Sequence, residues 1–121
     1  MKIITEKINS LPAHSITKKD VELVLKHVPQ EAFGVATIFK ISAQIFSKSK
    51  WDRPVVQNGT TYNILSRGLE KEFIIKELLI EIYVHLTKIY GMYAHRLSKE
   101  QRKNLEELVQ PVYEMIINEL K

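Results

Sequence analysis

The sequence contains no cysteine, and this absence excludes three kinds of site. A disulfide scaffold, a zinc site built from thiolates and a cysteine nucleophile all require that residue. The chain has only 4 glycines and 4 prolines, which excludes a collagen-like protein and a Pro/Gly-rich disordered one. Because the glycines are scattered, they form no phosphate loop and no dinucleotide motif.

Long apolar runs are absent as well. No stretch approaches the roughly 20 apolar residues that a membrane-spanning helix needs. The first ten residues mix charged and apolar side chains, unlike a secretory signal peptide. We therefore expect a cytoplasmic protein, without a membrane partner, that folds as a single domain over residues 1–121. The abundance of isoleucine and lysine indicates either a thermophilic source or an AT-rich genome.

Positive charge is concentrated in the first half of the chain. The net charge is +4, and residues 31–69 carry five basic side chains against two acidic ones. The excess centres on Lys48, Lys50 and Arg53, which flank Trp51. Basic residues beside an aromatic ring can bind a phosphate backbone and stack a base, so this segment is a candidate nucleic-acid-binding loop. The alternative is a solvated loop that the tryptophan anchors.

Two segments of the first half have a recognisable pattern. Thr17 and Asp20 form a variant of the capping box, and helical apolar spacing follows, so a helix is predicted over residues 18–27. Pro29 ends this helix, because the residue before a proline avoids the helical region. Residues 34–46 alternate β-branched and aromatic side chains, which predicts a long strand that is partly covered on both faces.

A hairpin is predicted next. Strand-forming residues over 55–57 and 60–64 flank Asn58 and Gly59. An Asn-Gly pair suits a two-residue type I′ turn, because both central residues need positive φ. Pro54 donates no ladder hydrogen bond, so the first arm should lie at an edge of the sheet.

Two helices complete the pattern. Apolar residues at helical spacing predict one long helix over residues 69–90 and another over residues 99–120. Ser98 and Gln101 make a capping box at the start of the second helix. Pro111 lies inside that helix and should kink or split it.

The order of these segments predicts an α+β domain. A small antiparallel sheet with a hairpin packs against the long helix and one or two further helices. The alternative is an all-α fold, in which the segment 34–46 is helical rather than extended.

The predicted long helix is apolar on two sides. A main stripe at helical spacing is accompanied by a second apolar row, formed by Phe73, Ile80 and Val84. A surface helix has one apolar stripe, so the second row indicates either burial within the domain or contact with a partner. We predict these three residues as the interface of a homodimer or of a complex with another protein.

Few polar residues have the spacing of a catalytic site. Glu81 and His85, one helical turn apart, are the one ligand-like pair, and zinc usually needs at least three protein ligands. A metal-dependent hydrolase with this pair as ligands, or with Glu77 as base, is an alternative. Otherwise, Glu77 and Glu81 are expected to lie solvated on the helix surface. The leading expectation includes no catalytic residue, metal or cofactor.

The order of helix, strand, edge hairpin and long helix resembles that of minimal zincin-like metallopeptidase domains. In that family, a helix carries HExxH, whose two histidines bind zinc and whose glutamate activates water. Here Glu77 stands at the position of the glutamate, while Lys76 and Ile80 stand where the histidines belong. The resemblance therefore implies a degenerate member that lacks HExxH and zinc.

These patterns together predict a protein without enzymatic activity that binds other proteins and self-associates. A nucleic-acid-binding protein that uses the tryptophan-containing basic loop is the first alternative, and a metal-dependent hydrolase is the second.

Overall fold

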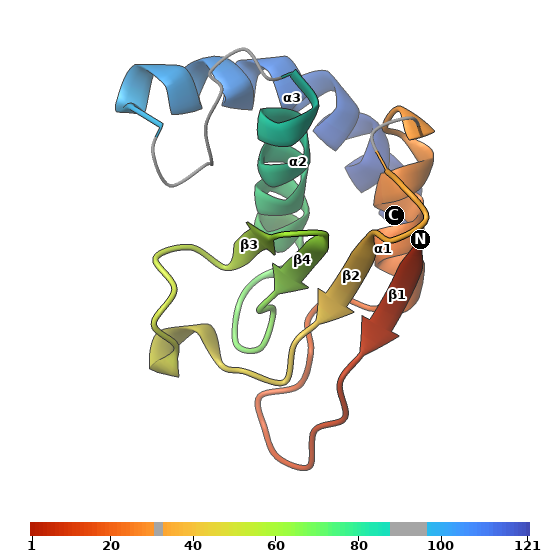
Figure 1. Cartoon of the computed structure of the whole chain (residues 1–121), viewed down its shortest axis with the longest axis vertical. Helices are drawn as coiled ribbons and strands as arrows, with labels where there is room; N and C mark the ends of the chain where they lie inside the picture. Colours follow the sequence, from red (N-terminus) through yellow and green to blue (C-terminus); the bar gives the residue numbers. More distant parts are fainter. Residues whose placement is uncertain (31–32, 88–96) are drawn as a thin grey trace.

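The computed structural model describes residues 1–30, 33–87 and 97–121 and confirms the α+β class. A mixed sheet of four strands packs against three helices (Figure 1). The elements are, in order, β1 (Lys2–Thr5), α1 (Lys18–Lys26), β2 (Ile38–Ile41), the 3₁₀ turn η2 (Phe46–Lys48), β3 (Val55–Asn58), β4 (Thr61–Ile64), α2 (Lys71–Thr87) and α3 (Lys99–Leu120). The all-α alternative is therefore wrong.

The sheet has the strand order β1-β2-β4-β3 and is mixed rather than antiparallel. β1 pairs in parallel with β2, and β2 pairs in parallel with β4, whereas β3 and β4 form the antiparallel hairpin. Strand β1 was not predicted, because its four residues carry little pattern of their own. Its partner, β2, lies more than 30 residues further along the chain.

The strand predicted over residues 34–46 is much shorter in the structure, where β2 spans only Ile38–Ile41. Both neighbouring strands are four residues long, so the hydrogen-bonding partners end there. Beyond Ser42 the chain leaves the sheet and forms the loop that contains η2. Alternation of β-branched residues marked the strand correctly, and the length of its partners set its ends.

The predicted hairpin is present, with its turn moved by one residue. Asn58 pairs with Thr61, so the central residues are Gly59 and Thr60 rather than Asn58 and Gly59. Gly59 has a φ of +63°, as the first central residue of a tight hairpin turn requires. β3, which follows Pro54, lies at the edge of the sheet as predicted.

Both capping boxes are confirmed. The side chain of Thr17 accepts a hydrogen bond from the amide of Asp20, and that of Ser98 accepts one from the amide of Gln101. α3 continues through Pro111, so the predicted split is wrong. For α2, residues 88–90 of the predicted helix lie outside the described residues.

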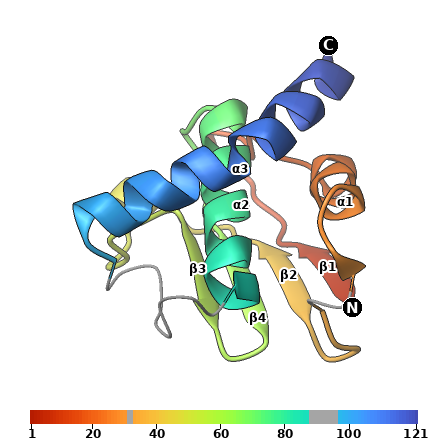
Figure 2. The same ribbon diagram turned by 90° about the horizontal axis from the view of Figure 1, so that it is seen from above.

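The helices form two layers over one face of the sheet. α1 and α2 pack against that face, and α3 crosses over α2 on the side away from the strands (Figure 2). In the sheet, the rings of Phe39 and Tyr62 stack on neighbouring strands with centroids 4.8 Å apart. α2 is therefore enclosed between the sheet and α3. No helix in the described ranges is long and apolar enough to cross a membrane.

This enclosure corrects the predicted interface. Ile80 and Val84 are only 1% and 7% exposed within the single chain, so they belong to its own core. Phe73, at the start of α2, is 44% exposed. The second apolar row exists because a 22-residue helix, α3, covers the side of α2 that the sheet leaves open. The prediction of Ile80 and Val84 as interface residues is therefore wrong.

Candidate functional site

The candidate nucleic-acid-binding segment, residues 48–53, is here called the basic loop. It follows η2 and leads into β3. The hydroxyl of Ser49 donates to the carbonyl oxygen of Phe46 at 2.8 Å and accepts from the amide of Trp51 at 3.3 Å. Trp51 is 38% exposed. Lys48 and Lys50 are exposed and form no ion pair with any described residue.

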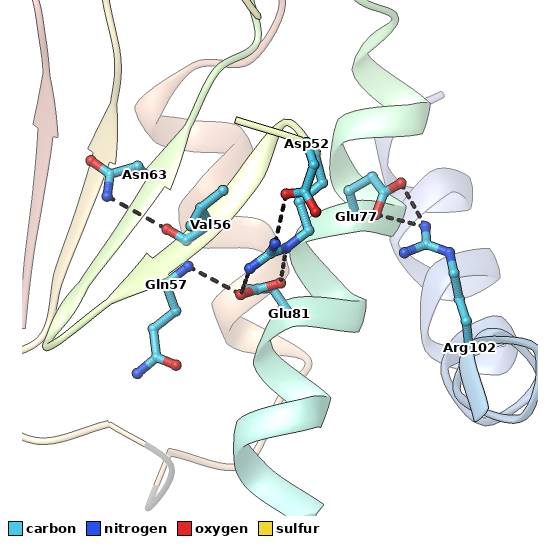
Figure 3. Close-up of polar contacts among 8 residues, drawn as sticks. Asp52, Val56, Gln57, Asn63, Glu77, Glu81 and Arg102 are labelled. Atoms are coloured by element: carbon cyan, nitrogen blue, oxygen red, sulfur yellow. Dashed lines mark hydrogen bonds and ion pairs between the residues drawn. The ribbon is translucent and has the colours of Figure 1, made fainter. Parts of the chain in front are cut away.

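Arg53, the last residue of the basic loop, faces the interior rather than solvent. Its Nε and one Nη donate to the two carboxylate oxygens of Glu81 at 3.2 and 3.3 Å (Figure 3). Its other Nη donates to Asp52 at 2.9 Å. The amide of Gln57, on β3, also donates to Glu81, at 3.1 Å. Arg53 therefore fixes the loop to α2, and its role as a nucleic-acid contact stays a prediction.

Burial and the negative charge of Glu81 also shift the pKa of a tyrosine in the sheet, Tyr62. Burial in the core, with a smaller contribution from this carboxylate, raises the pKa of Tyr62 to about 12. Tyr62 lies on β4 and is only 3% exposed. Ionising it would place a second negative charge in the same interior region, which the low local dielectric opposes.

The other buried acidic residue of α2, Glu77, is paired with an arginine on α3 rather than with one in the basic loop. Both carboxylate oxygens of Glu77 accept from one Nη of Arg102, on α3, at 2.7 and 2.8 Å (Figure 3). Burial alone lowers the pKa of Arg102, but the hydrogen bonds and charges of Glu77 and, to a smaller extent, of Glu106 together outweigh it, so the net shift is upward. Glu77 and Glu81 are 7% and 4% exposed. The expectation that they are solvated is wrong.

The predicted metal ligands do not converge. Glu81 is occupied by Arg53, whereas His85, one turn later, is exposed. His14 and His27 contact Glu6 and Glu119 instead, and His95 lies outside the described residues. Within the described ranges, no group of three histidine or acidic side chains can hold a metal ion.

Two of the three residues that carry the zincin-like resemblance, Lys76 and Glu77, contact α3. Lys76 donates to Gln110 at 3.2 Å and lies over the ring of Tyr113, 5.4 Å from its centroid. Glu77 holds Arg102, and Ile80 is in the core. The helix that would carry a zincin site therefore uses this face to bind α3.

Sequence reasoning missed a polar cluster at the carboxyl ends of the parallel strands. Arg67, just after β4, is 6% exposed and binds two other segments of the chain, one that contains Ser10 and Pro12 and one that contains Ala43. Its guanidinium donates to the carbonyl oxygens of Pro12, Ala43 and Ser10 at 2.7, 2.6 and 3.0 Å, and to the hydroxyl of Ser10 at 3.1 Å. No local sequence pattern predicts this cluster, because the residues that bind Arg67 lie 24 to 57 positions away in the chain.

A shallow pocket of about 250 Å³ opens beside this cluster. Its lining residues are Ala43, Gln44, Ile45, Lys48, Ser49 and Arg67. The pocket therefore adjoins the basic loop, with which it shares Lys48 and Ser49. Open α/β sheets commonly bind ligands beyond the carboxyl ends of their parallel strands, and this pocket lies at that end.

No protein-family model matches this sequence, and neither the curated proteins nor the solved structures contain a match. The geometry of the described residues therefore carries the functional argument.

Proposed function

We propose that this protein is a non-catalytic binding domain for single-stranded nucleic acid. The observation that carries the proposal is the partly exposed ring of Trp51, flanked by two lysines, Lys48 and Lys50, that form no ion pair with described residues. An aromatic face accepts an unpaired base of any sequence, and lysines neutralise the adjacent phosphates. Single strands are favoured over duplexes because stacking requires a free base face.

The anchoring of the basic loop supports the same proposal. Arg53 is fixed by Glu81, and Ser49 closes the turn that precedes Trp51. Binding to a loop that is already ordered costs less conformational entropy than binding to one that must be ordered first. The pairing of Arg53 thus removes one cation from the ligand contacts and gives the remaining contacts a fixed base.

The distribution of charge also favours a polyanion. Acidic side chains near the loop are occupied within the protein: Asp52 holds Arg53, and Glu6 accepts from the amide of Ala43 at 2.8 Å. The lysines of the loop keep their full charge toward solvent. Both buried glutamates of α2 are bound by arginines, which supports a binding role rather than a hydrolytic one.

Fluorescence titration tests the proposal directly, because Trp51 is the single tryptophan of the chain. Oligothymidylate should quench its emission, and raising the salt concentration should weaken binding steeply. Trp51→Ala should weaken binding, measured by anisotropy of a labelled oligonucleotide, by about 1–3 kcal/mol. Lys50→Ala should also weaken binding. Its matched control is Lys103→Ala, which removes an exposed lysine from α3. No binding at low salt would refute the proposal.

A second candidate is a protein-binding role on the outer surface of α3. Leu108 and Met115 are 48% and 55% exposed, and their spacing of seven residues puts them on one face of the helix. This surface replaces the one that the sequence predicted. Light scattering behind size-exclusion chromatography tests self-association: a dimeric mass that the double variant Leu108→Asp/Met115→Asp converts to a monomeric one would support it. A monomeric wild type at micromolar concentration would refute self-association.

A further inference from the structure

Within the described part of the chain, the positive charge of Arg67 has no carboxylate partner. Its hydrogen bonds all end on carbonyl oxygens or on a hydroxyl, and it forms no ion pair with any residue that the structure describes. The carboxylate of Glu6 accepts from the amide of Ala43, whose carbonyl oxygen accepts from Arg67. The guanidinium of Arg67, whose residue is 6% exposed, therefore has no counter-charge among the described residues. Buried charges are usually paired, so an external anion is a suitable complement.

The hydrogen-bonding capacity of Arg67 is not exhausted either. A guanidinium has five N–H groups, and the four bonds to Ser10, Pro12 and Ala43 leave one of them without a partner among the described residues. This remaining N–H belongs to the Nη that binds Ala43. Both Arg67 and Ala43 line the pocket.

A second cation stands at the same pocket. Lys48, the last residue of η2, lines it together with the polar side chains of Gln44 and Ser49. Lys48 makes no ion pair with the described residues, and it supplies a flexible ammonium opposite a fixed guanidinium. Arginine suits phosphate through its planar fork, and lysine binds phosphate as a point charge.

We infer that this pocket, formed by Arg67, Lys48, Gln44 and Ser49, binds a phosphoryl group. If the phosphoryl group belongs to a bound nucleic-acid strand, this inference rests on the proposed function and deepens it. The hydroxyl of Ser49, which lines the pocket, accepts a hydrogen bond from the amide of Trp51, so the pocket and the tryptophan belong to the same turn of the chain. A phosphate held beside Arg67 would place the neighbouring base near Trp51. The same chemistry also fits a free phosphate or a phosphorylated small molecule.

NMR of ¹⁵N-labelled protein, titrated with inorganic phosphate at constant ionic strength, tests the pocket alone. We expect saturable shifts for the amides of residues 43–49 and for the Nε–H of Arg67, whereas chloride causes none. Lys48→Ala should weaken phosphate binding by about tenfold, because it removes one of two cations. Lys50→Ala removes the same charge two residues away and should change the affinity by less than about twofold.

Equal effects of the two lysine variants, or shifts spread over all lysines without saturation, would overturn the inference. Arg67→Lys keeps the charge and loses the planar fork. If that variant stays folded, it should bind phosphate more weakly than the wild type does. If it unfolds, the comparison of Lys48 with Lys50 still decides, because both side chains are exposed and neither forms an ion pair with a residue that the structure describes.

A second experiment, which measures binding of a nucleic-acid strand, separates this inference from the proposed function. Competition between oligothymidylate and inorganic phosphate would identify the strand as the source of the phosphoryl group. Phosphate binding without strand binding would keep the pocket, assign it to a free phosphate compound and refute the nucleic-acid proposal. Strand binding that needs Trp51 but ignores both phosphate and Lys48→Ala would keep the nucleic-acid proposal and refute the pocket.

Discussion

Glu81, in the middle of α2, and Arg53, at the end of the basic loop, form an ion pair that is nearly closed to solvent. The two side chains are 4% and 11% exposed, and two hydrogen bonds of 3.2 and 3.3 Å join them (Figure 3). A third donor, the amide of Gln57, reaches the same carboxylate. This pair connects the central helix to the loop that carries the proposed binding residues, so core stability and loop geometry depend on one contact.

Replacing Glu81 by glutamine should therefore destabilise the protein. The variant leaves the largely buried guanidinium of Arg53 with the exposed Asp52 in place of two counter-charges, and breaking a buried pair costs about 3 kcal/mol. Urea unfolding followed by far-UV circular dichroism measures the loss. Glu22→Gln is the matched control, because Glu22 is exposed on α1 and should change stability by less than about 0.5 kcal/mol. Equal stability of the two variants would contradict the ion-pair assignment.

Truncating Ile80 distinguishes a core residue from an interface residue. Ile80→Ala should lower the free energy of unfolding by about 2–5 kcal/mol, because the side chain is sealed within the chain. Phe73→Ala should cost clearly less, since almost half of that side chain already contacts water. Thermal unfolding measures both variants. A stable, folded Ile80→Ala variant whose molecular mass is lower than that of the wild type would instead restore the interface hypothesis.

Alkaline conditions should weaken the fold through Tyr62. Burial, together with Glu81, raises its pKa from 10.0 to about 12 in the folded state. The stabilisation that its neutral form provides is complete below pH 10 and is lost as the pH rises through 12. Tyr62→Phe should thus lose less stability than the wild type between pH 10 and 12. Urea unfolding at pH 9 and at pH 11 measures the difference.

Two other tyrosines, Tyr83 and Tyr113, also have raised pKa values through burial. They are present in both proteins, so their contributions cancel in the comparison. A difference between wild type and Tyr62→Phe that stays constant from pH 9 to pH 11 would contradict the upward shift.

The capping box of α1 gives a smaller, local prediction. Asp20 accepts from the amide and hydroxyl of Thr17 at 2.8 and 3.0 Å, and its own amide donates to that hydroxyl. Thr17→Ala should reduce stability by about 1 kcal/mol, as is typical for loss of an N-cap. Ser47→Ala changes an exposed hydroxyl that caps no helix and serves as control. If chemical denaturation gives the two variants equal stability, the cap contributes nothing.

Local patterns in the sequence predicted the helix starts and the hairpin. Thr17 and Ser98 cap their helices through residues only three positions away, so the required partners are visible in the sequence itself. Pro54 marked an edge strand because its missing N–H is a property of one residue. The turn was displaced by one residue because cross-strand pairing, rather than the Asn-Gly pair, fixed the register.

The candidate site depended on contacts that no local pattern encodes. Arg53 and Glu81 are 28 residues apart, Arg102 and Glu77 are 25 apart, and Arg67 reaches back 57 residues to Ser10. The helical periodicity predicts that Glu77 and Glu81 lie on one solvated strip of α2. In the structure, each of them instead pairs with an arginine from a different element. The basic loop and its tryptophan were readable because exposed charge beside an aromatic ring is a property of neighbouring residues.

By itself, the amino-acid sequence determined the class of fold, the helix starts, the edge hairpin and the position of the basic loop, since each depends on residues a few positions apart. Only the tertiary structure decided that the second apolar row of α2 is interior, that its acids are paired and that Arg67 joins three loops. These outcomes require segments distant in the chain to pack together, and hydrophobic burial of α2 between the sheet and α3 is what brings them there.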